Sequence, residues 1–311
     1  MGSSTYGGAT YPPATAGTRG AARGRPAWLV ILTTGLILWL LTVAVTFLTG
    51  NANLIPTLVL LGSFLVPVSF VAWAYDHRDQ AITVEMMFKC FVVGGILGVL
   101  GASVLESYLL HPSWWIFVGV GLIEEGVKLA ALWFVTRNMT TRSVHSGVIL
   151  GATVGFGFAA FESSGYALNA LITVQGLSLR SLVETEILRG LLAPFGHGLW
   201  TGILGGLLFA GASSTGRLRL TGRLVLGYLG VALLHALWDS MHGIAVLLTY
   251  VLTSTAAQQR LFAAGWIPNP TDEQVQLFTV FSLGGMILIT VVALLWLRSI
   301  WRSGRHAAPV P

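Results

Sequence analysis

Residues 124–128 read Glu-Glu-Gly-Val-Lys and lie in the middle of an apolar run that extends from Trp114 to Val135. A helix that crosses a lipid bilayer normally excludes such groups, because each charge costs several kcal/mol unless it is paired or faces a wet cavity. Three charges within about one and a half helical turns are therefore difficult to explain as packing. Three further runs also carry ionisable groups, and together they predict a catalytic centre inside a membrane.

The composition supports this setting. The chain has 311 residues, of which 54% are hydrophobic and 9% are charged, whereas a soluble domain carries about 25% charged residues. The bilayer must therefore surround most of the chain, and we expect a multi-pass protein of the cell membrane. The formal charge of +5 does not predict nucleic-acid binding, because the arginines stand singly at the ends of apolar runs, as the positive-inside rule requires.

The hydropathy divides into eight runs, each near the ~20 residues that cross the hydrocarbon. We therefore expect an all-α, polytopic transmembrane bundle over 27–302, with a disordered tail at 1–26 and another at 303–311. The first run is too long for the apolar part of a signal peptide. Polar breaks separate the runs, including one from Gln175 to Glu186. The predicted spans are 27–48, 54–75, 90–110, 114–136, 144–172, 187–211, 224–252 and 277–297.

The distribution of Lys and Arg predicts the orientation. With both termini in the cytoplasm, thirteen basic residues lie on the inner side and three on the outer side, which is a strong asymmetry. Lys128 lies within a span. The inner residues are Arg19, Arg23, Arg25, Arg78, Lys89, Arg137, Arg142, Arg217, Arg219, Arg223, Arg298, Arg302 and Arg305; the outer residues are Arg180, Arg189 and Arg260.

Small residues recur at four-residue spacing in three spans, which allows helices to approach closely in lipid. The single Cys90 excludes an intrachain disulfide framework. Glu85 and Glu106 are expected to lie at the interface in structural roles. The three stripes are Gly147, Gly151 and Gly155; Gly94, Gly98 and Ala102; and Gly198, Gly202 and Gly206.

Four spans carry ionisable groups at a similar depth. At ~1.5 Å per residue, each group falls between the midplane and the outer surface of a ~30 Å hydrocarbon layer. His235 and Asp239 are four residues apart and so share a helical face. This agreement in depth predicts one shared site, composed of Glu124, Glu125, Lys128, Glu162, His197, His235 and Asp239.

Each group also has a structural interpretation. Lys128 can form a salt bridge with Glu124, four residues earlier. His197 can be a satisfied interior histidine, and Glu162 can bind a neighbouring helix. Asp239 can orient the histidine one turn before it. These interpretations work singly, but two histidines and several acids at one depth are too costly for a scaffold alone.

The residue types suit hydrolysis of a peptide bond. A carboxylate can act as general base on water, and a histidine can stabilise an oxyanion or protonate the leaving amine. Carboxylates and imidazoles are also zinc ligands. The residues therefore leave two mechanisms open. We favour a site without a cofactor, because Lys128 would repel a dication, with zinc on Glu125, His197 and His235 as the alternative.

Four motifs occur in order on successive spans: Glu-Glu-x-x-Lys at 124–128, Phe-Ala-x-x-Glu at 158–162 followed by Tyr166, His197 five residues before Gly202, and His235 four residues before Asp239. The combination resembles the PrsW family of intramembrane proteases and, more distantly, the type II CAAX prenyl endopeptidases. The resemblance covers about 114–243, the expected proteolytic core. It implies cleavage of a membrane-anchored protein, such as an anti-sigma factor, near the outer face. One departure is Ser163, where the family often has Asn.

Two other classes compete with a protease. Intramembrane acids and histidines also build the proton relays of transporters and channels, and an inverted repeat would support that function. No such repeat is visible, because the first three predicted spans carry no counterpart of the four motifs. A non-catalytic scaffold derived from a protease is the other alternative, and the intact motif set argues against it.

Overall fold

The computed structural model describes residues 25–212 and 216–306, so most of the tail predicted at 1–26 and the end of the chain after 306 lie outside the described residues. The described chain is almost entirely helical. In order, its elements are α1 (Ala27–Thr49), η1 (Ala52–Leu54), α2 (Ile55–Asp76), α3 (Val84–Val92), η2 (Val93–Leu97), α4 (Gly98–Leu109), α5 (Ile116–Thr136), α6 (Val144–Leu171), β1 (Ile172–Thr173), β2 (Gly176–Leu177), α7 (Leu179–Leu192), η3 (Ala193–Phe195), α8 (His197–Ala212), α9 (Gly222–Thr253), α10 (Ala256–Ala263) and α11 (Asp272–His306).

Seven helical segments of the described chain are long and apolar enough to cross a membrane. Some of these segments join two α-helices. Helix α3 continues through the π-helical turn η2 into α4, and α7 continues through the 3₁₀ turn η3 into α8. Helix α5, which carries three central charges, is not one of these seven segments. It packs against α4 and α9. The all-α polytopic bundle is confirmed, and the chain is a multi-pass membrane protein; the count of eight spans and their orientation remain predictions.

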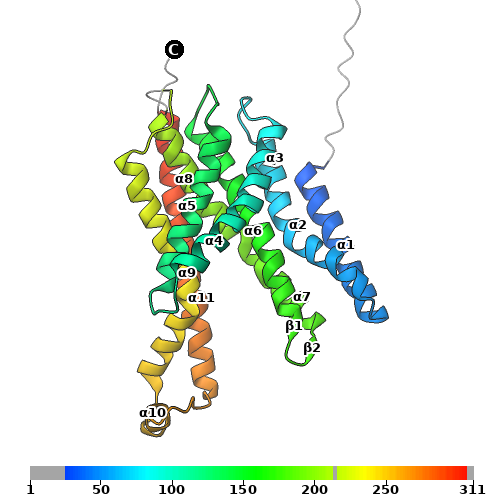
Figure 1. Cartoon of the computed structure of the whole chain (residues 1–311), viewed down its shortest axis with the longest axis vertical. Coiled ribbons are helices and arrows are strands. Elements are labelled where there is room, and N and C mark those ends of the chain that lie inside the picture. Colours follow the sequence, from blue (N-terminus) through cyan, green and yellow to red (C-terminus); the bar gives the residue numbers. More distant parts are fainter. Residues whose placement is uncertain (1–24, 213–215, 307–311) are drawn as a thin grey trace, which may run out of the picture.

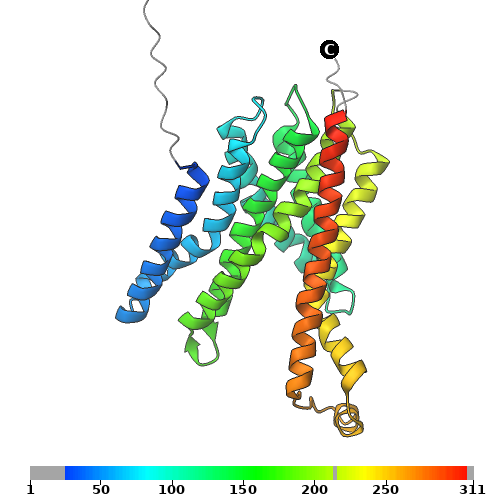
Figure 2. The same ribbon diagram turned by 180° about the vertical axis from the view of Figure 1, so that it is seen from behind.

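The two ends of the described chain lie at the same end of the bundle. Figure 1 shows the start of α1 and the end of α11 both toward the top, on opposite sides of the bundle, and Figure 2 shows the same from behind. Helices α9 and α11 extend beyond the others at the opposite end, where α10 joins them. This arrangement agrees with an even number of crossings.

Helices α6 and α8 form the centre of the bundle. In an apolar stretch of 18 residues in α6, 83% of the residues are buried. In the corresponding stretch of peripheral α1, 11% are buried, and its leucines face outward, as lipid requires. The predicted glycine stripe explains the close packing of α6 on α8. A Cβ on Gly151 would lie 2.3 Å from the Thr201 carbonyl oxygen, and one on Gly155 would lie 2.2 Å from that of His197. The two backbones are in direct contact because neither position carries a side chain.

Polar side chains fix the start of α6, at the end of the bundle that bears both ends of the described chain. Ser143 caps α6 by accepting a hydrogen bond from the Ser146 backbone N–H, as an N-cap serine does. The Ser143 and Ser146 hydroxyls also donate to Asp79, at 2.5 and 2.7 Å. Burial raises the pKa of Asp79, but these two hydrogen bonds and His145 outweigh burial and hold it below its ordinary value of 3.8.

Parts of the predicted breaks and of the predicted tail are helical. Residues 179–186, predicted as part of a polar loop, belong to α7, which Ser178 caps. The helix forms there because Leu182 and Glu186 are buried, while Arg180 and Glu184 pair one turn apart on the exposed face. Helix α11 continues to His306, so the first residues of the tail predicted at 303–311 are helical.

Candidate active site

Helix α5 supplies the two carboxylates and the ammonium of Glu124, Glu125 and Lys128. The Lys128 ammonium lies 3.2 Å from Glu124 Oε2 and 2.7 Å from Glu125 Oε1, and its side chain is fully buried. A buried ammonium needs such partners, because an unpaired charge in low dielectric is strongly unfavourable. The i+3 and i+4 spacing lets one lysine contact both carboxylates.

The two adjacent carboxylates point to different surroundings. Glu125 is fully buried, and it accepts hydrogen bonds from Lys128, from His235 Nδ1 at 3.1 Å and from the Thr201 hydroxyl at 3.4 Å. Glu124 lines a cavity of about 650 Å³ among α4, α5, α6, α7, α8 and α9. The structure therefore separates an interior carboxylate from one that faces the cavity.

His197 stands where the α7–α8 segment is interrupted. Pro194 lies in the 3₁₀ turn η3, and Gly196 leaves the helical conformation, so His197 begins α8 at the wall of the cavity. Its Nδ1 accepts from the Lys128 ammonium at 2.7 Å, which leaves Nε2–H to donate to Glu162 Oε2 at 3.1 Å. The ring thus bridges α5 and α6.

Glu162 has a second partner that the sequence did not reveal. Arg189 on α7 donates to Glu162 Oε2 at 2.5 Å and, through Nε, to the Ser163 hydroxyl at 2.8 Å. The guanidinium also lies over the ring of Tyr166, 4.1 Å from its centroid. Serine at position 163, where the family often has Asn, is thus an acceptor for this arginine.

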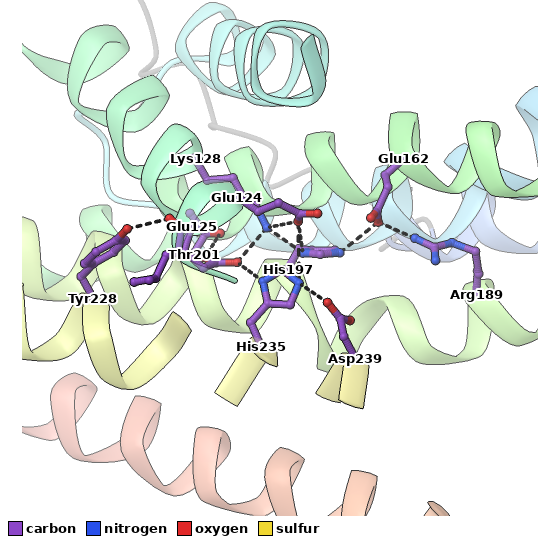
Figure 3. A network of polar contacts seen from close by, with 11 residues as sticks. Glu124, Glu125, Lys128, Glu162, Arg189, His197, Thr201, Tyr228, His235 and Asp239 are labelled. Atoms are coloured by element: carbon purple, nitrogen blue, oxygen red, sulfur yellow. Dashed lines mark hydrogen bonds and ion pairs between the residues drawn. The ribbon is translucent and has the colours of Figure 1, made fainter. Parts of the chain in front are cut away.

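Helix α9 supplies the remaining two groups. His235 Nε2 lies 3.3 Å from Asp239 Oδ2 and 3.7 Å from Glu124 Oε2. His235 is almost fully buried, whereas Asp239 is partly exposed and lines the cavity. Figure 3 shows the result: the seven residues predicted from the sequence form one network, which Arg189 and Thr201 extend, while Tyr228 donates to the nearby Leu122 carbonyl.

The donor set fits a divalent metal ion. Glu124, His197 and His235 each offer a ligand atom, and these atoms lie within 4.8 Å of one another. The other nitrogen of each imidazole donates to a carboxylate, Glu162 for His197 and Glu125 for His235, as is usual for zinc-binding histidines. Two histidines and a glutamate are a known catalytic zinc set. Glu124 takes the place predicted for Glu125, whose oxygens already serve Lys128, His235 and Thr201.

The charges of the network also bear on the metal. Its four carboxylates outnumber its two fixed cations, Lys128 and Arg189, by two, so two protons or one dication would balance it. The Lys128 ammonium, however, occupies the lone pair of His197 Nδ1. A metal ion at this nitrogen requires that the ammonium turn toward the two carboxylates alone.

Comparison with known proteins identifies the family. Residues 83–264, more than half of the chain, match the family described as PrsW family intramembrane metalloprotease. The chain belongs to the PrsW family. It is therefore an intramembrane peptidase. The match runs from the start of α3 to the end of α10 and includes all seven predicted site residues. The curated proteins and the solved structures contain no match to this chain.

Two further residues of this PrsW-family site were missed. Glu106, predicted to be interfacial, lines the cavity from α4, and Trp200 lines it from α8. Trp200 is the third residue after His197, so its place on the same helical face was a usable signal. Glu106 and Arg189 lie on other elements, and only the tertiary fold brings them to the cavity.

Proposed function

We propose that the chain hydrolyses a peptide bond of a membrane-anchored protein near the extracytoplasmic face, with Glu124 as the group that activates water. The observation that carries this proposal is the cavity, which Glu124 lines together with His197, Glu162 and Asp239. A carboxylate at the wall of a cavity can act as general base on a water molecule that comes within hydrogen-bond reach.

The reaction conserves every proton. Glu124 accepts a proton from water as the water oxygen attacks the carbonyl carbon of the scissile bond, and the carbonyl π pair moves onto its oxygen. That pair then re-forms the carbonyl as the carbon–nitrogen bond breaks. The leaving nitrogen takes the proton held by Glu124, and the products are a carboxylic acid and an amine.

The other network residues position these groups. Glu125 holds the side chain of His235, and Lys128 holds that of His197. Arg189 fixes Glu162, which holds the other nitrogen of His197. Rigid placement of this kind supplies much of an enzyme's rate, because a misplacement of about 1 Å costs roughly 10²-fold.

A metal ion has its ligands in the same place. Glu124, His197 Nδ1 and His235 Nε2 would hold zinc, which when bound supplies Lewis-acid chemistry and a more acidic water. The family description favours this version, and the position of Lys128 favours the metal-free one. The two versions share both histidines and differ in whether Glu124 is a ligand or the base.

The cavity extends toward the predicted outer surface. Its lining includes Phe117, in the first turn of α5, and Asn169, in the last turn of α6. The count of thirteen basic residues against three predicts that those helix ends lie on the extracytoplasmic side. This geometry supports cleavage in the outer half of the bilayer, of a substrate such as a membrane-anchored anti-sigma factor, by a core within 114–243.

The test uses purified protein in liposomes with a panel of single-pass reporter proteins that differ in their extracytoplasmic juxtamembrane segment. We expect at least one reporter to be cut in the outer half of its span, as mapped by mass spectrometry of the product. Exhaustive chelation and measurement of bound zinc then separate the two versions: the metal-free site keeps its turnover, and the zinc site loses it. Cleavage of no reporter would contradict the proposal.

A further inference from the structure

An unpaired hydrogen-bond donor lies beside the two histidines. Trp200 on α8 is 1% exposed, and its indole Nε1–H has no hydrogen-bond partner within the described chain. Its ring packs against His235 at a centroid distance of 4.6 Å and an angle of 33°. It meets His197 edge-on at 5.4 Å. The indole ring is thus held against both histidines of the network.

Packing does not explain the choice of tryptophan. A buried N–H without an acceptor is unfavourable, because it has lost its hydrogen bond to water. The other interior donors nearby are satisfied: the Thr201 hydroxyl binds Glu125, and the Tyr228 hydroxyl binds the Leu122 carbonyl. A buried polar group left unpaired among satisfied neighbours calls for a role that supplies its partner.

The position of the indole indicates what that partner is. Seven buried side-chain atoms in the described residues lack a hydrogen bond, and two of them belong to residues that line the cavity. One is an oxygen of Glu106, which is an acceptor when ionised; the other is the N–H of Trp200, which can only donate. An incoming peptide offers its carbonyl oxygens as acceptors, and Trp200 lines the cavity that such a peptide would enter.

We propose that the indole N–H of Trp200 donates a hydrogen bond to the carbonyl oxygen of the scissile peptide and to the oxyanion formed from it. This inference rests on the proposed function. When water attacks, the carbonyl π pair moves onto that oxygen, and the N–H bond of the indole stays intact. A fixed donor that is itself shielded from water stabilises the developing charge more than the neutral carbonyl. Trp200 therefore acts mainly in the transition state.

The test replaces only the N–H. Benzothienylalanine at position 200 keeps the two fused rings and exchanges the N–H for sulfur, whereas 5-fluorotryptophan keeps the N–H. The substrate is the reporter that the parental protein cleaves fastest. We expect the benzothienyl variant to lose about 10²–10³ in kcat with KM unchanged, because the lost contact is made in the transition state. The fluorinated variant keeps its turnover.

The matched control is benzothienylalanine at Trp133, which lies on α5 outside this cavity and should leave both constants unchanged. Parental kcat in the benzothienyl variant at position 200 would overturn the role of Trp200 and leave the proposed function intact. An equal loss in both isosteres, or a rise in KM alone, would also overturn it, since neither follows from a missing transition-state donor. If the parental protein cleaves no reporter, the proposed function fails, and this inference fails with it.

Discussion

Replacing Gly155 by alanine should disable the site without touching any of its side chains. Gly155 lies on α6, and its Cα faces the start of α8. A Cβ there would lie 2.2 Å from the carbonyl oxygen of His197, whereas ordinary van der Waals contact begins at 3.4 Å. The two helices must therefore separate locally by about 1.2 Å.

That displacement is large on the scale of the site. His197 Nε2 donates to Glu162 at 3.1 Å, and Nδ1 accepts from Lys128 at 2.7 Å; hydrogen bonds of this kind weaken within a few tenths of an ångström. A misplacement of about 1 Å costs roughly 10²-fold in rate. Overpacking itself costs about 1–3 kcal/mol. We therefore expect turnover to fall about 10²-fold while the protein still folds.

The assay is reporter cleavage in liposomes, with thermal unfolding in detergent measured alongside. The matched control is Gly165→Ala on the same helix, where an added Cβ meets nothing within 4 Å. This control should keep its turnover and gain slightly in stability, because alanine favours a helix over glycine by roughly 0.5–1 kcal/mol. Parental turnover in Gly155→Ala would refute the claim that backbone contact between α6 and α8 places His197.

Three further predictions concern regions away from the cavity. Trp39 donates to the buried carboxylate of Glu186 at 2.8 Å, so Trp39→Phe should cost about 1–3 kcal/mol; an unchanged unfolding temperature would contradict this. In a variant without the native cysteine, an impermeant thiol reagent applied to intact cells should label Gln175→Cys and not Ser303→Cys, and the reverse pattern would overturn the predicted orientation. Because the pKa of Asp79 is held below 3.8, its contribution to stability is present above that pH and is lost as the pH falls through the lowered pKa. The stability advantage of the parental protein over Asp79→Asn should therefore be constant near neutral pH and shrink below about pH 4, and an advantage independent of pH would contradict this.

Hydropathy and spacing were sufficient for the all-α membrane bundle and for seven members of the network. Long apolar runs must be helices in lipid, because no other local structure satisfies the backbone there. Intramembrane charges are so costly that they had to converge, which is why Glu124, Glu162, His197 and His235 could be grouped across four helices before any contact was known.

Side-chain direction and partners from distant helices could not be obtained in this way. Adjacent residues on a helix point about 100° apart, but only the packing of α9 and α8 around Glu125 determines that Glu124 is the one facing the cavity. Arg189 was counted as an outer-side charge, because nothing in its local sequence relates it to Glu162. The helix at 179–186 was missed for a similar reason, since the burial of Glu186 against Trp39 depends on α1.

The most direct test of the central claim compares two neighbouring substitutions, Glu124→Gln and Glu125→Gln, in the reporter assay, with thermal unfolding of each variant. If Glu124 performs chemistry at the cavity wall, Glu124→Gln should lose about 10²–10⁴ in turnover and lower the unfolding temperature less than Glu125→Gln does, because Lys128 lies 3.2 Å from Glu124 and 2.7 Å from Glu125. Glu125→Gln should lower both, because it leaves the buried Lys128 with a weaker partner. Exposed Glu85→Gln, the control, should change neither. Parental turnover in Glu124→Gln would contradict the account.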